Sequence, residues 1–197
     1  MRRCRYGDAG QAFPIYITVV GGLLLLAFAY LAVGQAAAKR NDAQTAADAA
    51  ALAAAQDTRD QFVDLWVEKL HDPTAWQAIL HGDVGTPTSC TRAYELAAQN
   101  DASVELCEPG PLSYEVEVKT NDSVGRSIVP HTEDQHAKAS AKAVIEPLCA
   151  VQPPAEGAKD DVLPQLSCKD GRDWDIDLDD PAGLPEPQDL FDVHLAE

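Results

Sequence analysis

Positive charge is scarce in this chain beyond residue 40. The 197 residues include 15 Lys or Arg and 32 Asp or Glu, and the formal net charge is −17. Only 10 of the basic residues follow Arg40, against 31 acidic ones, so that part has a net charge of −21. A body this acidic repels nucleic acid and anionic lipid. The sequence therefore disfavours a nucleic-acid-binding function and is typical of a soluble, self-repelling surface.

Recognisable catalytic motifs are absent. The chain has no Gly-rich phosphate loop, no G-x-S-x-G, no H-E-x-x-H and no Ser-x-x-Lys. The five histidines are scattered, and His131 and His136 lie five residues apart, a poor spacing for two metal ligands on a helix or a strand. We therefore expect no catalytic residue, no cofactor and no metal site.

One acidic run near the C-terminus resembles a calcium-binding loop in its spacing. Asp180 stands where such a loop has its sharp-turn glycine, and Pro181 and Pro185 break the geometry. The alternation of Trp174, Ile176 and Leu178 explains the same spacing as a strand, which is the interpretation we favour over calcium binding. The residues at loop positions 1, 3, 5 and 12 are Asp175, Asp177, Asp179 and Glu186.

The cysteines do not form the close pairs that zinc sites use. No C-x-x-C occurs, and the spacings between the last four cysteines suit a disulfide framework better than zinc. Four cysteines allow three connectivities, which sequence alone does not separate. We favour sequential pairing, because the first pair would bracket one helix and the second would hold the C-terminal tail. The predicted disulfides are Cys90–Cys107 and Cys149–Cys168, with Cys4 left on the other side of the membrane.

A long apolar run lies near the N-terminus, before the acidic part of the chain and its four cysteines. No charged residue lies between Asp8 and Lys39. At a rise of 1.5 Å per residue, residues 13–33 cover roughly 30 Å, the thickness of the hydrocarbon core of a bilayer. The run predicts one membrane-spanning helix, with residues 12–38 in contact with lipid.

The orientation of that span follows from two observations. Three arginines precede it and two basic residues follow it, and the disulfide-forming cysteines all come after it. Both favour a cytoplasmic N-terminus and an extracytoplasmic body. A cleavable secretory signal is the alternative, because Ala36-Ala37-Ala38 offers an A-x-A site. The span is longer than the usual 7–15 residues of such signals, so we favour an uncleaved anchor.

An alanine-rich helix continues from the span. Residues 46–55, AADAAALAAA, have the strongest helix preference in the chain, and Asp72-Pro73 ends the helical pattern. We place the likeliest bend at Asn41-Asp42. The large apolar residues beyond the alanines fall on one arc, with carboxylates opposite, which predicts an amphipathic helix with one buried face. That arc consists of Leu52, Phe62, Val63, Trp66, Val67 and Leu70.

The remainder predicts an α+β domain. Residues 76–80 and 91–100 are expected to be helical, and 82–89 and 151–161 to be loops. The clean alternation in 112–120 predicts a strand, and 137–147 predicts its antiparallel partner. Residues 174–178 and 191–195 are short strand candidates. We expect four segments: a cytoplasmic N-terminus (1–11), the transmembrane helix (12–38), the alanine-rich helix (39–71) and the extracytoplasmic α+β domain with its acidic tail (72–197).

One stretch of the sequence is similar to a known family. A G-x-A-like start before an apolar helix, then Gly-Gln-Ala and QTAADAAALAAAQ, resembles the Flp pilus-assembly TadE/TadG-like family in its actinobacterial form. The likeness is specific over about residues 7–56. It implies a non-enzymatic, membrane-anchored, pseudopilin-like component of a tight-adherence pilus or secretion system, with other proteins of that assembly as partners. Pilin-type signals usually carry Glu five residues after the cleaved glycine, whereas Gly7 is followed by Ala12 and Gly10 by Ile15 at that position.

Two other functions are compatible with the sequence: a stalked binding or adhesion module, and an anchored extracytoplasmic enzyme. The alanines could pack against neighbouring copies, giving a homo-oligomer, or against the chain's own body. If they pack between copies, Ala50→Leu or Trp should spare folding and reduce assembly. The expected helix-packing residues are Ala46, Ala47, Ala50, Ala51 and Ala54.

Overall fold

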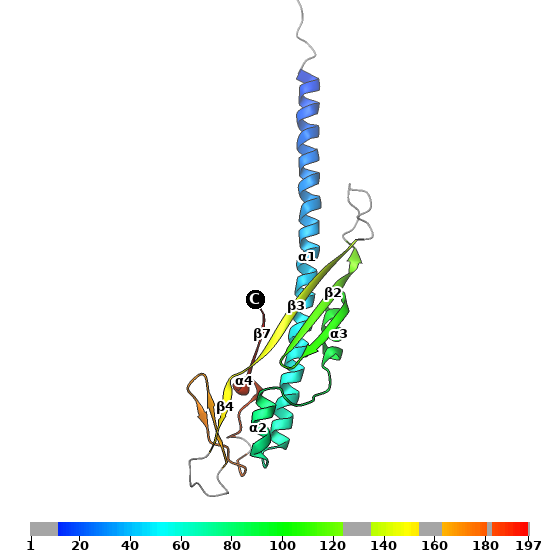
Figure 1. The fold of residues 1–197 in the computed structure, drawn as a ribbon. Helices are drawn as coiled ribbons and strands as arrows, with labels where there is room; N and C mark the ends of the chain where they lie inside the picture. The colour runs from blue at the N-terminus through cyan, green and yellow to red at the C-terminus, as the bar shows by residue number, and fades with distance from the viewer. Residues whose placement is uncertain (1–11, 124–134, 154–162, 181–182, 197) are drawn as a thin grey trace, which may run out of the picture.

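The predicted class, an α+β domain behind a long N-terminal helix, is confirmed. The computed structural model describes residues 12–123, 135–153, 163–180 and 183–196. Helix α1, Ala12–Glu68, is followed by the smaller helices and two antiparallel sheets of the domain (Figure 1). The N-terminal segment 1–11, with Cys4 and the candidate processing positions Gly7 and Gly10, lies outside the described residues.

Helix α1 runs for 57 residues without interruption. At 1.5 Å per residue it is about 86 Å long. Its first half projects away from the rest of the molecule, and its second half lies inside the domain (Figure 1). The predicted bend at Asn41-Asp42 is wrong, because both residues are helical. Strong helix formers on either side outweigh the weak helix preference of these two residues.

Two short helices follow α1 and surround its C-terminal part. Helix α2, Pro73–Leu80, begins with a proline, which costs no hydrogen bond in the first turn. The Trp76 Nε1–H donates to the Lys69 carbonyl at 2.9 Å and closes the turn between α1 and α2. Helix α3, Cys90–Gln99, packs along α1. The helices predicted at 76–80 and 91–100 are both present.

A four-stranded antiparallel sheet covers α1. Its strands are β1 (Ala102–Gly110), β2 (Ser113–Ser123), β3 (His136–Pro147) and β7 (Phe191–Leu195), in the order β1-β2-β3-β7. In the centre of the sheet Val116 lies opposite Ala141, and the predicted pairing of these two strands is confirmed. The strand predicted at 191–195 is also present. Strand β1 is not predicted by the sequence pattern.

A second, smaller sheet lies at the far end of the domain from the apolar half of α1 (Figure 1). It consists of β4 (Cys149–Gln152), β5 (Gln165–Cys168) and β6 (Asp173–Trp174), and α4 (Pro187–Leu190) leads from it into β7. The strand predicted over 174–178 is wrong beyond Trp174. Strand β5 begins at Gln165, and Pro164 before it has no N–H with which to extend the ladder. Most of the predicted loop at 151–161 lies outside the described residues.

The hydrophobic core is built around the C-terminal part of α1. Phe62 and Trp66 are at most 1% exposed and pack against Phe191 and Trp76, with ring centroids 5.9 and 5.4 Å apart. The predicted buried face of α1 is therefore present. Val67 departs from it, being 43% exposed. Residues 39–68 of α1 and the following domain thus share one core, rather than being a stalk and a separate body.

Candidate functional site

The N-terminal half of α1 exposes its apolar side chains. Nothing in the described part of the chain covers them, and the most apolar window of the helix is 0% buried. A soluble surface rarely carries an apolar patch of this size, and the run is long enough to cross a bilayer. The large side chains, all more than half exposed, are Phe13, Ile15, Tyr16, Ile17, Val19, Leu23, Leu24, Leu25, Leu26, Phe28, Tyr30, Leu31 and Val33.

The alanines of α1 pack against the chain's own domain. The sheet covers them through β2 and β3, and α3 lies along α1 as well. Alanine leaves room for a sheet to approach a helix backbone closely, and β3 contributes further small residues, Ala139, Ala141 and Ala143, to the same core. Seven alanines of α1 are 0% exposed: Ala43, Ala46, Ala47, Ala50, Ala51, Ala54 and Ala55.

This burial answers the question that the sequence left open. Of the two packing partners considered for Ala46, Ala47, Ala50, Ala51 and Ala54, the structure uses the chain's own body. A second copy has no access to side chains that are fully covered. The expectation that Ala50→Leu would spare folding is therefore wrong, because the added atoms would enter a filled core.

A buried polar network joins α1 to the domain just beyond the alanines. The Thr58 hydroxyl donates to the Tyr114 hydroxyl at 2.9 Å and lies 2.7 Å from the Ser89 hydroxyl. The Ser89 N–H also donates to the Tyr114 oxygen, at 3.1 Å, and the Gln61 amide donates to the Ser89 hydroxyl at 2.9 Å. Thr58, Ser89 and Tyr114 are all at most 3% exposed. Hydrogen bonds of this kind have exacting geometry, so they fix the position of α1 relative to α3 and β2.

The first disulfide joins the start of α3 to β1. Cys90 and Cys107 are bonded, with their Cα atoms 6.0 Å apart. Cys90 follows Ser89 of the polar network directly. The disulfide and the network therefore hold the same corner of the domain against α1.

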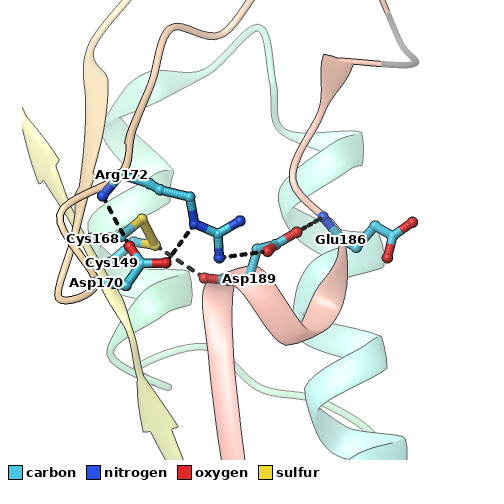
Figure 2. The surroundings of a disulfide bond; sticks show 6 residues. All are labelled: Cys149, Cys168, Asp170, Arg172, Glu186 and Asp189. Atoms are coloured by element: carbon cyan, nitrogen blue, oxygen red, sulfur yellow. Dashed lines mark hydrogen bonds and ion pairs between the residues drawn. A yellow bond between two sulfur atoms is a disulfide. The ribbon is translucent and has the colours of Figure 1, made fainter.

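The second disulfide joins neighbouring strands of the small sheet. Cys149 of β4 lies directly opposite Cys168 of β5 in the strand pairing, and the two are bonded. The pairing is the sequential one favoured from the sequence. Figure 2 shows Arg172 beside this disulfide, with its guanidinium between Asp170 and Asp189. Hydrogen bonds from the Arg172 backbone and side chain lower the pKa of Asp170.

Asp189 ties this region to the last helix. Its carboxylate pairs with Arg172 at 2.9 Å and accepts the Glu186 N–H at 3.0 Å, at the start of α4 (Figure 2). Its carbonyl oxygen lies 3.3 Å from the Cys149 sulfur. These contacts hold the acidic tail beside the second disulfide. Both carboxylate oxygens of Asp189 therefore have a partner within the chain, and their role is structural.

The residues with calcium-loop spacing do not converge. The Asp175 carboxylate accepts a hydrogen bond from Gln165 at 2.6 Å, and Asp177 accepts the Asp179 N–H at 2.9 Å. Glu186 belongs to the start of α4. Asp175 and Asp177 thus have separate local partners, and no cluster of potential metal ligands forms among the described residues of this run. The His131–His136 pair falls partly outside the described residues, and His136 Nδ1 lies 2.8 Å from the Thr120 carbonyl.

The sequence analysis did not identify one group of potential metal ligands among the described residues. Glu146, Asp192 and His194 come together because β3 pairs with β7, and their ligand atoms lie within 4.8 Å of one another. Lys169 forms an ion pair with Glu146 and lowers the pKa of that carboxyl, and His194 lies 2.9 Å from Asp192. Partners already present account for these charges. We therefore assign no metal site here.

Two features dominate the described residues: a bare apolar helix, and a domain closed around the continuation of that helix. No curated protein and no solved structure matches the chain. Residues 10–57, which contain the exposed apolar run and the buried alanines of α1, match the model of the Flp pilus-assembly TadE/G-like family, so this part of the chain is similar to that family.

Proposed function

We propose that the protein is a single-pass, membrane-anchored, pseudopilin-like component of a Flp-type pilus or secretion assembly. The observation that carries the proposal is α1, whose exposed apolar half continues without a break into the core of the domain. The same helix therefore serves as anchor and as scaffold. The family match over residues 10–57 covers the exposed half of the helix and its buried alanines.

Continuity of α1 gives the domain a defined position relative to the membrane. The first fully buried alanine, Ala43, lies 10 residues beyond Val33, or about 15 Å along the helix. No flexible linker separates the span from the domain in α1. A movement of the span would be passed directly to the domain, which suits a subunit that is positioned by neighbouring membrane helices.

The proposed orientation places the domain outside the cytoplasm. Two disulfides within the domain favour an oxidising compartment. Basic residues before the span, Arg2, Arg3 and Arg5, favour a cytoplasmic N-terminus. Protease treatment of intact protoplasts should then remove the domain while lysis adds no further cleavage. Complete protection of residues 72–197 in intact protoplasts would overturn this orientation.

The assembly role is tested by exchanging the span. Replacing residues 13–33 with an unrelated Leu-Ala span of equal length should keep the chain in the membrane, because length and hydropathy are preserved. If neighbouring helices recognise the native span, cross-linking to other pilus-assembly components and the number of pili should both fall sharply. A stalked binding module would instead tolerate the exchange and depend on the domain. Unchanged assembly would favour that alternative.

A further inference from the structure

A groove at the membrane-proximal end of the domain carries positive charge. It lies between α1 and the beginning of β3 and has a volume of about 530 Å³. Val33, Ala36 and Ala37 form its apolar wall. Arg40 from α1 and His136 and Lys138 from β3 supply its polar side. This local concentration of basic side chains contrasts with the net charge of −21 beyond residue 40.

The groove lies at the level of lipid headgroups if α1 spans a bilayer. Val33 is the last large apolar residue of the exposed run, and Arg40 follows it by seven residues, or about 10 Å of helix. The headgroup layer extends about 5–8 Å beyond the hydrocarbon core on each side. The wall formed by Ala36 and Ala37 therefore falls within that layer, and the long Arg40 side chain can reach back into it.

The two adjacent basic residues of α1 have different surroundings. Lys39 lies 3.8 Å from Asp42 and 3.6 Å from Asp122, so carboxylates of the domain already compensate its charge. Arg40 is exposed, and its side chain has no hydrogen bond or ion pair with any residue that the structure describes. Arg40 is therefore the cation of this pair that is available to an external anion.

The β3 side of the groove offers one further group for an anion, the His136 ring. His136 Nδ1 donates to the Thr120 carbonyl, which fixes the ring and leaves Nε2 for another partner. Lys138 forms ion pairs with Glu105 and Glu117, and these raise its pKa. As at Lys39, these carboxylates already compensate the charge of Lys138, so Arg40 is the cation of the groove that an external anion can reach.

We propose that this groove binds the phosphate of an anionic phospholipid headgroup, with Arg40 as its main ligand. The inference rests on the proposed membrane-spanning function of α1. A bilayer lipid is the occupant we favour because the wall at Val33, Ala36 and Ala37 continues directly from the lipid-exposed surface of α1. The acyl chains would lie along that surface while the phosphate lies beside Arg40. Guanidinium binds phosphate through two parallel hydrogen bonds, and it does so more specifically than a lysine ammonium.

The test measures which lipids remain on the full chain. The protein is reconstituted in nanodiscs of equal phosphatidylglycerol and phosphatidylcholine, released, and its retained lipids are counted by native mass spectrometry. The wild type should retain phosphatidylglycerol preferentially. Arg40→Gln should reduce that retention about fivefold, the effect expected for one cation near an anionic surface. Retention of phosphatidylcholine should not change.

Arg92→Gln is the matched control. It removes the same charge, but Arg92 lines a different surface hollow, beside Gln56 and Asp60. These residues lie 16 to 20 positions beyond Arg40 on α1, or about 24–30 Å further from the span. Equal loss in both variants, or equal retention of the two lipids by the wild type, would overturn the proposal. Complete displacement of phosphatidylglycerol by excess inorganic phosphate would do so too, since it would indicate a site for free phosphate.

Failure of this inference is distinguishable from failure of the proposed function. If α1 does not span the bilayer, the wild type will not float with liposomes in a sucrose gradient. If only the headgroup site is wrong, the wild type and Arg40→Gln will both float and will retain the same lipids. Far-ultraviolet circular dichroism of Arg40→Gln should match that of the wild type, because the exposed side chain has no intramolecular partner among the described residues.

Discussion

Thr58 and Tyr114, 56 residues apart in the chain, share a buried hydrogen bond of 2.9 Å between α1 and β2. The Tyr114 oxygen also accepts the N–H of Ser89, so one phenol holds the long helix, the sheet and the start of α3 together. The domain is thereby fastened to the same helix that carries the apolar span.

Tyr114→Phe should destabilise the domain. The substitution leaves the Ser89 N–H buried without its acceptor and removes one of the two hydroxyl partners of Thr58, which costs about 1–3 kcal/mol of unfolding free energy. Chemical denaturation of the full chain in detergent measures the change. Tyr94→Phe is the matched control, because Tyr94 is 53% exposed and should tolerate the loss of its hydroxyl. Equal stability of the two variants would contradict the role assigned to the network.

Ala50→Leu should destabilise folding rather than act selectively on assembly. Ala50 is 0% exposed in the shared core, and the three further carbon atoms of a leucine side chain have no space there. Overpacking of a filled core costs about 1–3 kcal/mol. Ala49→Leu is the control on the neighbouring position, since Ala49 is half-buried and lines an open hollow. A normal melting temperature for Ala50→Leu together with lost assembly would instead restore the intermolecular role of the alanines.

Removal of either disulfide should lower stability by a similar amount. The bonded cysteines are separated by 17 and 19 residues, and the chain-entropy model gives about 3 kcal/mol for closed loops of this size. The double variants Cys90→Ala with Cys107→Ala, and Cys149→Ala with Cys168→Ala, can be compared by thermal melting with and without reductant. Each should lose part of its sensitivity to dithiothreitol. Non-reducing peptide mapping that joined Cys107 to Cys149 would contradict the pairing.

The ion pairs around Arg172 and Lys169 should make stability fall modestly on acidification. Partners lower the folded-state pKa values of Asp170 and Glu146, so these carboxyls bind protons less readily in the folded state than in the unfolded one. Their contribution is present above the unfolded pKa, near 4, and is lost as the pH falls through the folded pKa. Both pairs are solvent-exposed, so the effect is small.

The measurement is the melting temperature between pH 6 and pH 3. Arg172→Gln should show a shallower acid-induced decrease than the wild type, since it removes the group that lowers the pKa of Asp170. Arg92→Gln, which removes a charge from another exposed pair, with Glu95, is the control for the loss of one positive charge. If Arg172→Gln left the decrease of the melting temperature with pH unchanged, other groups would determine the acid sensitivity.

Local patterns determined much of the fold from the sequence. The apolar run of residues 13–33 has no charge to place in water, so it predicts the exposed helix directly. The alternation in β2 and β3 matches the two-residue period of a strand with one buried face, and the pairing of the two follows. The family resemblance over the helix was confirmed over residues 10–57.

The sequence predicted strands less well where apolar and polar residues do not alternate regularly. Strand β1 contains Cys107 and Pro109 and is mostly exposed, so it shows no alternation that could be recognised. Ile176 and Leu178 alternate as a strand would, but the neighbouring β5 is too short to pair with them. Strand formation depends on a partner, which a sequence pattern does not contain.

The sequence by itself determined that an apolar helix continues into an alanine-rich one. Only the tertiary structure decided what the alanines contact, because a small side chain allows close approach by a helix of another copy or by the chain's own sheet equally well. The grouping of Arg40 with His136 and Lys138 was also decided there. Residues almost 100 positions apart meet because antiparallel pairing brings the start of β3 back beside the end of the span, and only long-range strand register can do that.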